Sequence, residues 1–356
     1  MKRYRIAVLP GDGIGNEVIP QALKALDLVA ELNGGFGFEF TSYPWGCEYY
    51  LEHGRMLPAD GMKRLADSDA ILLGAIGWPE QVPDHISLRE LLLRIRFEFD
   101  LYINIRPVKR LPGVQGPLRT EAPIDILFVR ENSEGEYAGL GGRFKVGTPD
   151  ETALQTAVFT RKGTERVMRY AFERARERRG LLLSATKSNA CNYSMVFWDD
   201  VFAEISRDYP DVRTQSQHVD ALAARVVTHP ESLDTVVASN LFADILTDLG
   251  GALQGSLGIP VSGNIDPERR HPSMFEPVHG SAPDIAGRGQ ANPIAAIWSG
   301  ALMLDHLGER ESAAALIRSI EAVTAAGQSL TPDLGGHAST QQVTAAILVE
   351  LRRIVH

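Results

Sequence analysis

The chain contains little cysteine and no long apolar run. Its two cysteines, Cys47 and Cys191, lie far apart among 356 residues and fit no metal-binding spacing. A disulfide framework is therefore not expected, and a reduced, cytoplasmic compartment is favoured. The N-terminal segment MKRYRIAVLPGDG has an apolar run of only four residues. We expect neither a signal peptide nor a membrane-spanning segment.

An excess of positive charge is also absent. The formal net charge is −9, which argues against nucleic acids and anionic membranes as partners. An anionic small substrate would then need a local cationic pocket. Hydrophobic residues make up 44% and charged residues 23%, the ordinary balance of a soluble globular protein. A chain of this length is too long for one small core, so two domains are expected.

The hydrophobic pattern predicts an α/β protein, because short apolar strands alternate with amphipathic helices. No repeat or low-complexity tract interrupts this pattern. Turn-rich segments at 107–117 and 255–273 are candidate crossings between domains. The expected strands are 4–10, 36–43, 69–76, 101–108, 124–130, 153–160, 181–186, 212–219 and 234–239. The expected helices are 16–33, 163–179, 194–208, 290–307, 309–326 and 340–354.

A complete dinucleotide fingerprint is missing. The loop from Gly11 to Gly15 follows a predicted strand, but Asn16 occupies the third glycine position of G-x-G-x-x-G. The backbone amides of such a loop suit an anion, and a plain tight turn explains the loop equally well. No Rossmann site is assigned from it.

The segment 238–251, ASNLFADILTDLGG, spaces Asn240, Asp244 and Asp248 four residues apart. On a helix these positions share one face, roughly 5–6 Å apart. Carboxylates held so close attract a hard divalent cation with oxygen ligands. A solvated acidic face is the alternative, but the apolar flanks of the segment favour a metal.

Three arginines form a second candidate group: Arg96, Arg106 and Arg130. Arg106 directly precedes a proline and Arg130 ends an apolar strand, where a cation can point into a cleft. The planar guanidinium matches a carboxylate. Taken singly, each arginine is as well explained by a surface charge.

Three further residues suit proton transfer or metal binding. Lys187 ends a buried strand, where desolvation or nearby cations can lower the pKa of an amine and make it a base. Asp220 follows another strand, and Tyr137 comes seven residues after Arg130. A surface role is the alternative for Lys187. The polar loop 275–293 either wraps a ligand or is a long connection, and loops of this length are usually functional.

Taken together, these blocks make the whole chain resemble the β-decarboxylating dehydrogenases, the family of isocitrate and 3-isopropylmalate dehydrogenases. The motifs are LPGDGIG, RENSEGEY, TKSN, NLFADILTDLGG, HGSAPDIAG and TPDLGGHAST, in order along the chain, with Arg96 and Arg106 at the family spacing. Segments 45–54, 74–88 and 194–200 most resemble the branch of the family that acts on tartrate and D-malate.

The resemblance implies a role for each candidate. Lys187 would be the base for the substrate hydroxyl and Tyr137 the acid that protonates the enol. Arg96, Arg106 and Arg130 would hold the substrate carboxylates. Asp244 and Asp248, with Asp220 from a second subunit, would bind Mg²⁺ or Mn²⁺. The cofactor would contact His279, Gly280, Ser281, Ala282, Pro283, Asp284, Ile285 and Asn292.

The resemblance also implies an isopropylmalate dehydrogenase-like two-domain α/β/α sandwich, not a Rossmann fold. A cofactor-binding domain would combine 1–102 with 256–356, and 103–255 would bind substrate and metal and form a homodimer with shared active sites. The expected cofactor is NAD, since Asp284 would repel a 2′-phosphate, and K⁺ is a further candidate. The expected substrate is a small dicarboxylic 2-hydroxy acid, D-malate or tartrate, that is oxidatively decarboxylated to a keto acid and CO₂.

Several positions leave alternatives open. Ala243 stands where the family usually has glycine, and Arg89 where the tartrate/malate branch usually has an aromatic residue. Leu92 and Leu93 match the isopropyl pocket of isopropylmalate dehydrogenases but occur in both branches. A 3-isopropylmalate or related dehydrogenase is the alternative activity. A non-catalytic acid-binding subunit and an acyl- or phosphate-handling enzyme are the other classes considered.

Overall fold

The computed structural model describes residues 2–119 and 122–355, which form two compact units. One unit combines residues 2–101, 110–119 and 251–355, and the other combines 102–109 and 122–250. The boundaries differ from the expected ones at three places: Tyr102 belongs to the second unit, and 110–119 and 251–255 belong to the first. The assignment of one unit to cofactor and the other to substrate stays a prediction.

The first unit is a five-stranded α/β layer built around β3 (Ala70–Ala75). This strand is buried along its whole length, as expected for an apolar strand covered on both faces. The strand order is β2-β1-β3-β12-β11, parallel except for the antiparallel pair β11 and β12. The remaining strands are β1 (Lys2–Gly11), β2 (Phe36–Ser42), β11 (Val261–Ile265) and β12 (Ser273–Pro277).

Helix α10 (Ile294–Leu307) is the central helix of the first unit. It is apolar on nearly every side, which is the pattern of a buried helix. It packs against α1 (Gly15–Asn33), α11 (Arg310–Ala326) and strands β11 and β12. The other helices are α2 (Cys47–His53), α3 (Gly61–Ala66), α4 (Asp84–Ser87), α5 (Leu93–Glu98) and α12 (Thr340–Val355), and Leu88–Leu92 is a π-helical turn.

The second unit holds a five-stranded sheet in the order β4-β5-β10-β8-β9. Its strands are β4 (Ile103–Lys109), β5 (Asp125–Glu131), β10 (Thr235–Ala238), β8 (Leu181–Thr186) and β9 (Arg213–His218). Only β4 and β5 pair antiparallel. The helices are α6 (Arg161–Arg176), α7 (Ser194–Ile205), α8 (Val219–Thr228) and α9 (Asn240–Leu253).

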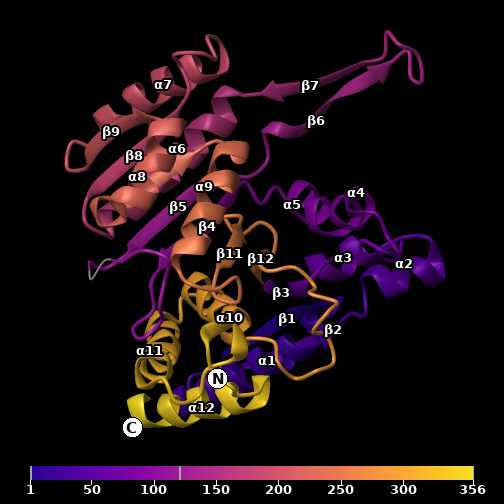
Figure 1. Ribbon diagram of the computed structural model, residues 1–356, viewed down its shortest axis with the longest axis vertical. Coiled ribbons are helices and arrows are strands. Elements are labelled where there is room, and N and C mark those ends of the chain that lie inside the picture. Colours follow the sequence, from indigo (N-terminus) through magenta and orange to yellow (C-terminus); the bar gives the residue numbers. More distant parts are fainter. Residues whose placement is uncertain (1, 120–121, 356) are drawn as a thin grey trace. The chain divides into compact units, whose positions relative to one another are not determined.

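A two-stranded arm, β6 (Gly135–Phe144) and β7 (Thr152–Val158), extends away from the sheet of the second unit (Figure 1). Leu140, Phe144 and Leu154 on this arm are each 54% exposed. An isolated two-stranded ribbon is marginally stable in water, and apolar side chains exposed along it favour burial against another surface. Strand β6 was not predicted from the sequence.

The glycine loop after β1 packs against protein backbone. Gly13 has φ +53°, and a Cβ there would lie 2.0 Å from the carbonyl oxygen of Ser281. The Ile14 amide donates to that same oxygen at 2.8 Å. Asp12 accepts from the amides of Cys47 and Gly77, each at 2.8 Å. The loop therefore anchors the segment at Ser281, which gives its glycines a structural role.

The α/β class and most predicted strands are confirmed. One interpretation was wrong: segment 255–273 was predicted as a turn-rich crossing between domains, but it lies within the first unit and contains the buried strand β11. The loop expected at 275–293 likewise begins inside β12. Both cysteines are free thiols, Cys47 buried and Cys191 exposed. In the part of the chain that the structure describes, no helix is both long and apolar enough to cross a membrane.

Candidate active site

The acidic motif forms the first half of α9, directly after β10. Asp244 and Asp248 lie one helical turn apart, with 30% and 73% of their side chains exposed. Asn240, the third member of the sequence spacing, is buried. Its side-chain oxygen accepts from Nε and Nη2 of Arg130 at 2.9 and 2.7 Å. Asn240 therefore orients an arginine, and the carboxylates that remain on the motif are Asp244 and Asp248.

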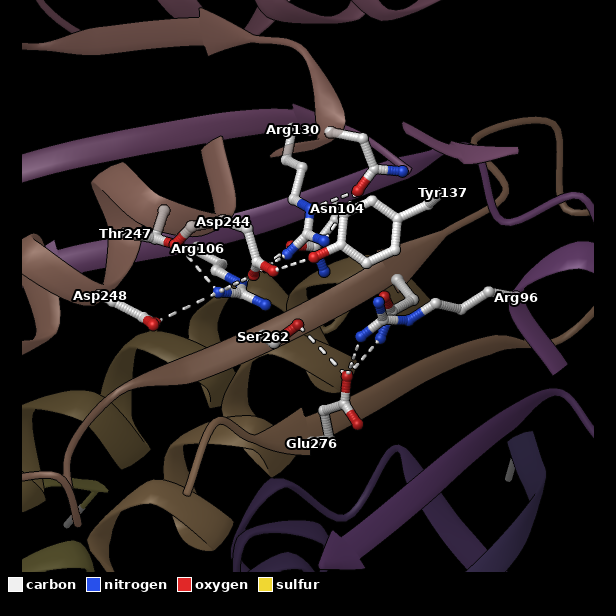
Figure 2. Close-up of polar contacts among 12 residues, drawn as sticks. Arg96, Asn104, Arg106, Arg130, Tyr137, Asp244, Thr247, Asp248, Ser262 and Glu276 are labelled. Carbon is white, nitrogen blue, oxygen red and sulfur yellow. Dashed lines mark hydrogen bonds and ion pairs between the residues drawn. The ribbon is translucent and has the colours of Figure 1, made fainter. Parts of the chain in front are cut away.

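Two buried arginines converge on Asp244 (Figure 2). Arg130, at the end of β5, contacts Asp244 through Nη1, and Arg106 on β4 approaches the same carboxylate at 3.2 Å. Arg106 also donates to Thr247 Oγ1 at 2.8 Å and to Asn104 Oδ1 at 3.0 Å. Bonds of this kind hold each guanidinium in one orientation. The antiparallel pairing of β4 and β5 brings together two residues that are 24 positions apart in sequence.

Tyr137 completes this group from the start of the arm. Its hydroxyl donates to Asp244 Oδ2 at 2.8 Å, and its ring lies 5.5 Å from the Arg130 guanidinium carbon. Burial raises the pKa of Tyr137, and the bond to Asp244 adds to this shift. The phenol therefore keeps its proton and presents it beside two cations. We call Arg106, Arg130, Tyr137, Asp244 and Asp248 the catalytic cluster, after the role that is proposed for them below.

The two carboxylates of the cluster differ in electrostatic character. Burial acts to raise the pKa of Asp244, but the charges of Arg130 and Arg106 outweigh it and the pKa falls. Partial desolvation raises the pKa of Asp248, although much of the side chain is exposed, and the charge of Asp244 adds to the effect. The negative charge of Asp244 is thus balanced by two arginines. The charge of Asp248 is balanced less well, since Arg106 is 3.9 Å away from it.

Lys187 and Asp220 form a separate ion pair in the same unit. Lys187 follows β8, Asp220 lies in the first turn of α8, and their charged atoms are 2.9 Å apart. The hydrogen bond from Lys187 lowers the pKa of Asp220. Among residues 2–119 and 122–355, no three His, Cys, Asp or Glu side chains gather as metal ligands. One chain therefore does not bring Asp220 together with Asp244 and Asp248.

Arg96 belongs to the first unit, at the end of α5. It is 6% exposed and contacts Glu276 on β12 at 2.9 Å. Glu276 also accepts from Asn264 on β11 at 2.8 Å (Figure 2 shows the Arg96–Glu276 contact). The Nε of Arg96 is buried without a hydrogen-bond partner among the described residues. Sequence reasoning missed Glu276, because its strand was taken as part of a loop.

The segment expected to bind the cofactor forms an ordered loop in the first unit. Glu17 on α1 accepts from the amides of Gly287 and Gly289, the latter at 2.9 Å. Asp284 is exposed, and no side chain or amide within the described ranges bonds to its carboxylate. Burial lowers the pKa of His279, whose Nε2 is buried without a partner in the described part of the chain. The exposed carboxylate of Asp284 is therefore accessible to a polar ligand, whereas the His279 ring has a buried Nε2 and an Nδ1 atom 3.0 Å from the Gly280 carbonyl oxygen.

The other expected cofactor residues have varied surroundings. The Ser281 carbonyl receives the Ile14 amide, and Ala282 has φ +40°, which is unusual for a residue with a Cβ. Asn292 donates to Asp333 at 2.9 Å and accepts from the Ile294 amide at 3.0 Å, so it fixes the start of α10. Gly280 and Pro283 are exposed and Ile285 is half-buried. Contact between this loop and a cofactor stays a prediction.

The fold is a two-unit α/β architecture without a Rossmann domain, and its second unit holds two buried arginines around a carboxylate. The sequence model of the isocitrate/isopropylmalate dehydrogenase family matches residues 5–347. The chain belongs to this family. The resemblance inferred from the motifs and the fold class is therefore confirmed.

Individual proteins with high sequence identity to this chain show which members of the family it is similar to. The chain is 54% identical over 99% of both chains to a "Probable tartrate dehydrogenase/decarboxylase" of Bacillus subtilis. It is 52% identical to the "D-malate dehydrogenase [decarboxylating]" of Escherichia coli, over 98% of both. The crystal structure of isocitrate dehydrogenase from Methylococcus capsulatus superposes with a TM-score of 0.87 at 33% identity, covering 98% of this chain and 99% of that one.

Proposed function

We propose that the protein oxidatively decarboxylates D-malate or tartrate to a keto acid and CO₂, using NAD and Mg²⁺ or Mn²⁺. The observation that carries this proposal is the catalytic cluster. Two buried arginines and a protonated tyrosine surround one carboxylate, and a second carboxylate lies one turn away on α9. The names of the relatives, tartrate dehydrogenase/decarboxylase and D-malate dehydrogenase, support the choice of substrate.

The residues fit a hard divalent cation in ligand type, since Asp244 and Asp248 offer only oxygen atoms. Two carboxylates from one chain are too few for a closed site, and substrate oxygens with Asp220 of a second copy would complete it. When bound, the cation would stabilise the enolate as a Lewis acid, and NAD would accept the hydride. The exposed carboxylate of Asp284 suits hydrogen bonds from ribose hydroxyls.

The protein's own residues then bind the substrate and move protons. Arg106 and Arg130 are positioned to hold carboxylates of a dianionic acid, and Arg96 would add a further contact. Lys187 would accept the C2 hydroxyl proton as the C2 hydride leaves, which requires its pair with Asp220 to open. The C3–carboxylate bond then breaks and releases CO₂. Tyr137 would donate its proton to C3 of the enol, completing the keto acid.

A homodimer with shared sites is part of the proposal. Two features support it. The arm of β6 and β7 exposes apolar side chains. Within the described residues of one chain, Asp220, the partner of Lys187, does not join Asp244 and Asp248 in one group of ligands. A second copy that covered the arm would place a Lys187–Asp220 pair near each catalytic cluster.

Substrate preference provides the test of the proposed activity. We expect D-malate to give the highest kcat/KM, tartrate to be measurably oxidised, and 3-isopropylmalate to be slower by at least about tenfold, about 1.4 kcal/mol. Each methylene-sized increment of an isopropyl group adds only about 1–3 kcal/mol, even in a well-formed apolar pocket. Initial rates of NADH formation on all the acids under one set of conditions measure the ranking.

The same assay separates the alternatives. If kcat/KM for 3-isopropylmalate equals or exceeds that for D-malate, the activity is that of a 3-isopropylmalate or related dehydrogenase. No NADH from any of these acids, with metal present and the fold intact, would instead support a non-catalytic subunit.

Cofactor choice depends on Asp284. We expect wild-type protein to prefer NAD, because a 2′-phosphate beside this exposed carboxylate is repelled. Asp284→Lys should narrow the ratio of kcat/KM for NAD over NADP by about tenfold or more. Glu311→Lys, which makes the same change of charge at an exposed acid on α11, is the matched control. Wild-type efficiency that is equal with both cofactors would contradict the assignment.

A further inference from the structure

A hollow of about 590 Å³ in the second unit is lined by arginines from three different segments of the chain. Arg179 follows α6, Arg213 begins β9, and Arg225 lies on α8. These elements lie together beside β8 (Figure 1). The other lining residues are Leu181, Thr214, Gln215, Ser232 and Asp234. We call this site the arginine hollow.

Asp234, the carboxylate among the described residues that line the hollow, is already satisfied. Asp234 is 1% exposed and accepts from Arg178 Nε at 2.9 Å and from the Arg179 amide at 3.0 Å. Arg178 also donates to Asp125 Oδ1 at 2.9 Å. Arg178 and Arg179 are therefore balanced by Asp125 and Asp234, and these four charges cancel.

The two remaining arginines are not balanced by an acid. Arg225 donates only to neutral groups: Ser232 Oγ at 2.9 Å, Gln215 Oε1 at 3.0 Å, and Gln217 Oε1 at 3.2 Å. These bonds fix its guanidinium but leave its charge uncompensated. Arg213 is exposed, and across the described residues no polar contact engages its side chain. The hollow thus carries two net positive charges in a chain whose net charge is −9.

We propose that the arginine hollow binds a small organic polyanion with at least two carboxylate or phosphate groups. A guanidinium fork recognises either group in two-pronged fashion. Arg225 would supply a fixed positive charge and Arg213 the free donors. Pockets that enclose small organic ligands measure roughly 300–1,000 Å³, so the hollow has room for more than an inorganic ion.

The hollow lies at the opposite end of β8 from Lys187. Leu181 begins this six-residue strand and Lys187 directly follows it, so a strand of about 20 Å separates the two. A ligand in the hollow would therefore leave Lys187 and the catalytic cluster uncovered. This binding site does not depend on the proposed function.

Isothermal titration calorimetry with two probes, pyrophosphate and tricarballylate, tests the site in metal-free, low-salt buffer. We expect at least one probe to bind wild-type protein with Kd below about 1 mM. Arg213→Gln and Arg225→Gln should each weaken that binding by about tenfold or more. Arg318→Gln, at an exposed arginine on α11, is the matched control and should leave it unchanged. A probe that also binds the catalytic cluster would still bind it in Arg213→Gln. Only the binding that this variant loses is therefore assigned to the arginine hollow.

The outcomes separate the possibilities. Loss of pyrophosphate binding alone assigns a phosphate-bearing ligand, loss of tricarballylate binding alone assigns a polycarboxylate, and loss of both assigns the shared chemistry. Thermal unfolding checks each variant. If Arg225→Gln proves unstable, Arg213→Gln still decides, because its side chain supports no other contact. Failure of both probes to bind, unchanged binding in Arg213→Gln, or an equal loss in Arg318→Gln would overturn the proposal.

Discussion

Asp244→Asn is expected to lower kcat/KM by about a thousandfold or more, equivalent to about 4 kcal/mol of transition-state stabilisation. A neutral amide is a poor ligand for a hard cation, and it cannot balance the charges of Arg106 and Arg130. The substitution keeps the size of the side chain, and an amide oxygen can still accept from Tyr137. Steady-state kinetics on D-malate, with metal varied, measures the loss.

Two controls separate a chemical effect from a structural one. Asp305→Asn makes the same change on a helix of the first unit and should leave kcat/KM within about twofold, as for an ordinary surface position. Thermal unfolding of Asp244→Asn should show a cooperative transition. Near-normal turnover by a folded Asp244→Asn protein would remove Asp244 from the proposed mechanism.

Mixing two inactive variants is expected to restore activity if the active sites are shared. Lys187→Ala and Tyr137→Phe subunits would each form dimers with two defective sites. In a hybrid dimer, one site receives both lesions and the other receives neither. After random exchange about half the dimers are hybrids, so about a quarter of wild-type activity should return.

The exchange itself must be measured alongside the activity. Native mass spectrometry reports the fraction of hybrids, and activity should rise in proportion to it. As a control, Lys187→Ala mixed with Lys187→Gln should recover nothing, because both lesions remove the same residue. Full exchange without recovery in the first mixture would place Lys187 and Tyr137 in the site of one chain.

Much of the fold followed from local pattern. The apolar run at β3 and the spacing of α9 predict their structures directly. Burial on both faces gives a continuous apolar run, and burial along one stripe of a helix gives a helical period. Strand β11 left no such signal, since its segment is rich in glycine and proline and reads as a turn. Its burial depends on pairing with β12, which is a tertiary effect.

The candidate site was predictable in its residue types but not in its contacts. Arg106 and Arg130 were grouped with each other but not with Asp244, and the pairing of β4 with β5 brings both arginines to that carboxylate. Asn240 was grouped with the acids by its spacing, whereas the structure uses it to orient Arg130. Glu276, the partner of Arg96, was missed because ion pairs between distant elements leave no periodicity in sequence.

The central claim is that oxidation and decarboxylation are coupled in one enzyme. The most direct measurement is the ratio of CO₂ released to NADH formed when purified, metal-loaded protein turns over D-malate. The proposed mechanism predicts one CO₂ for each NADH throughout the reaction. NADH formed without matching CO₂, with a four-carbon keto acid as the accumulated product, would contradict it.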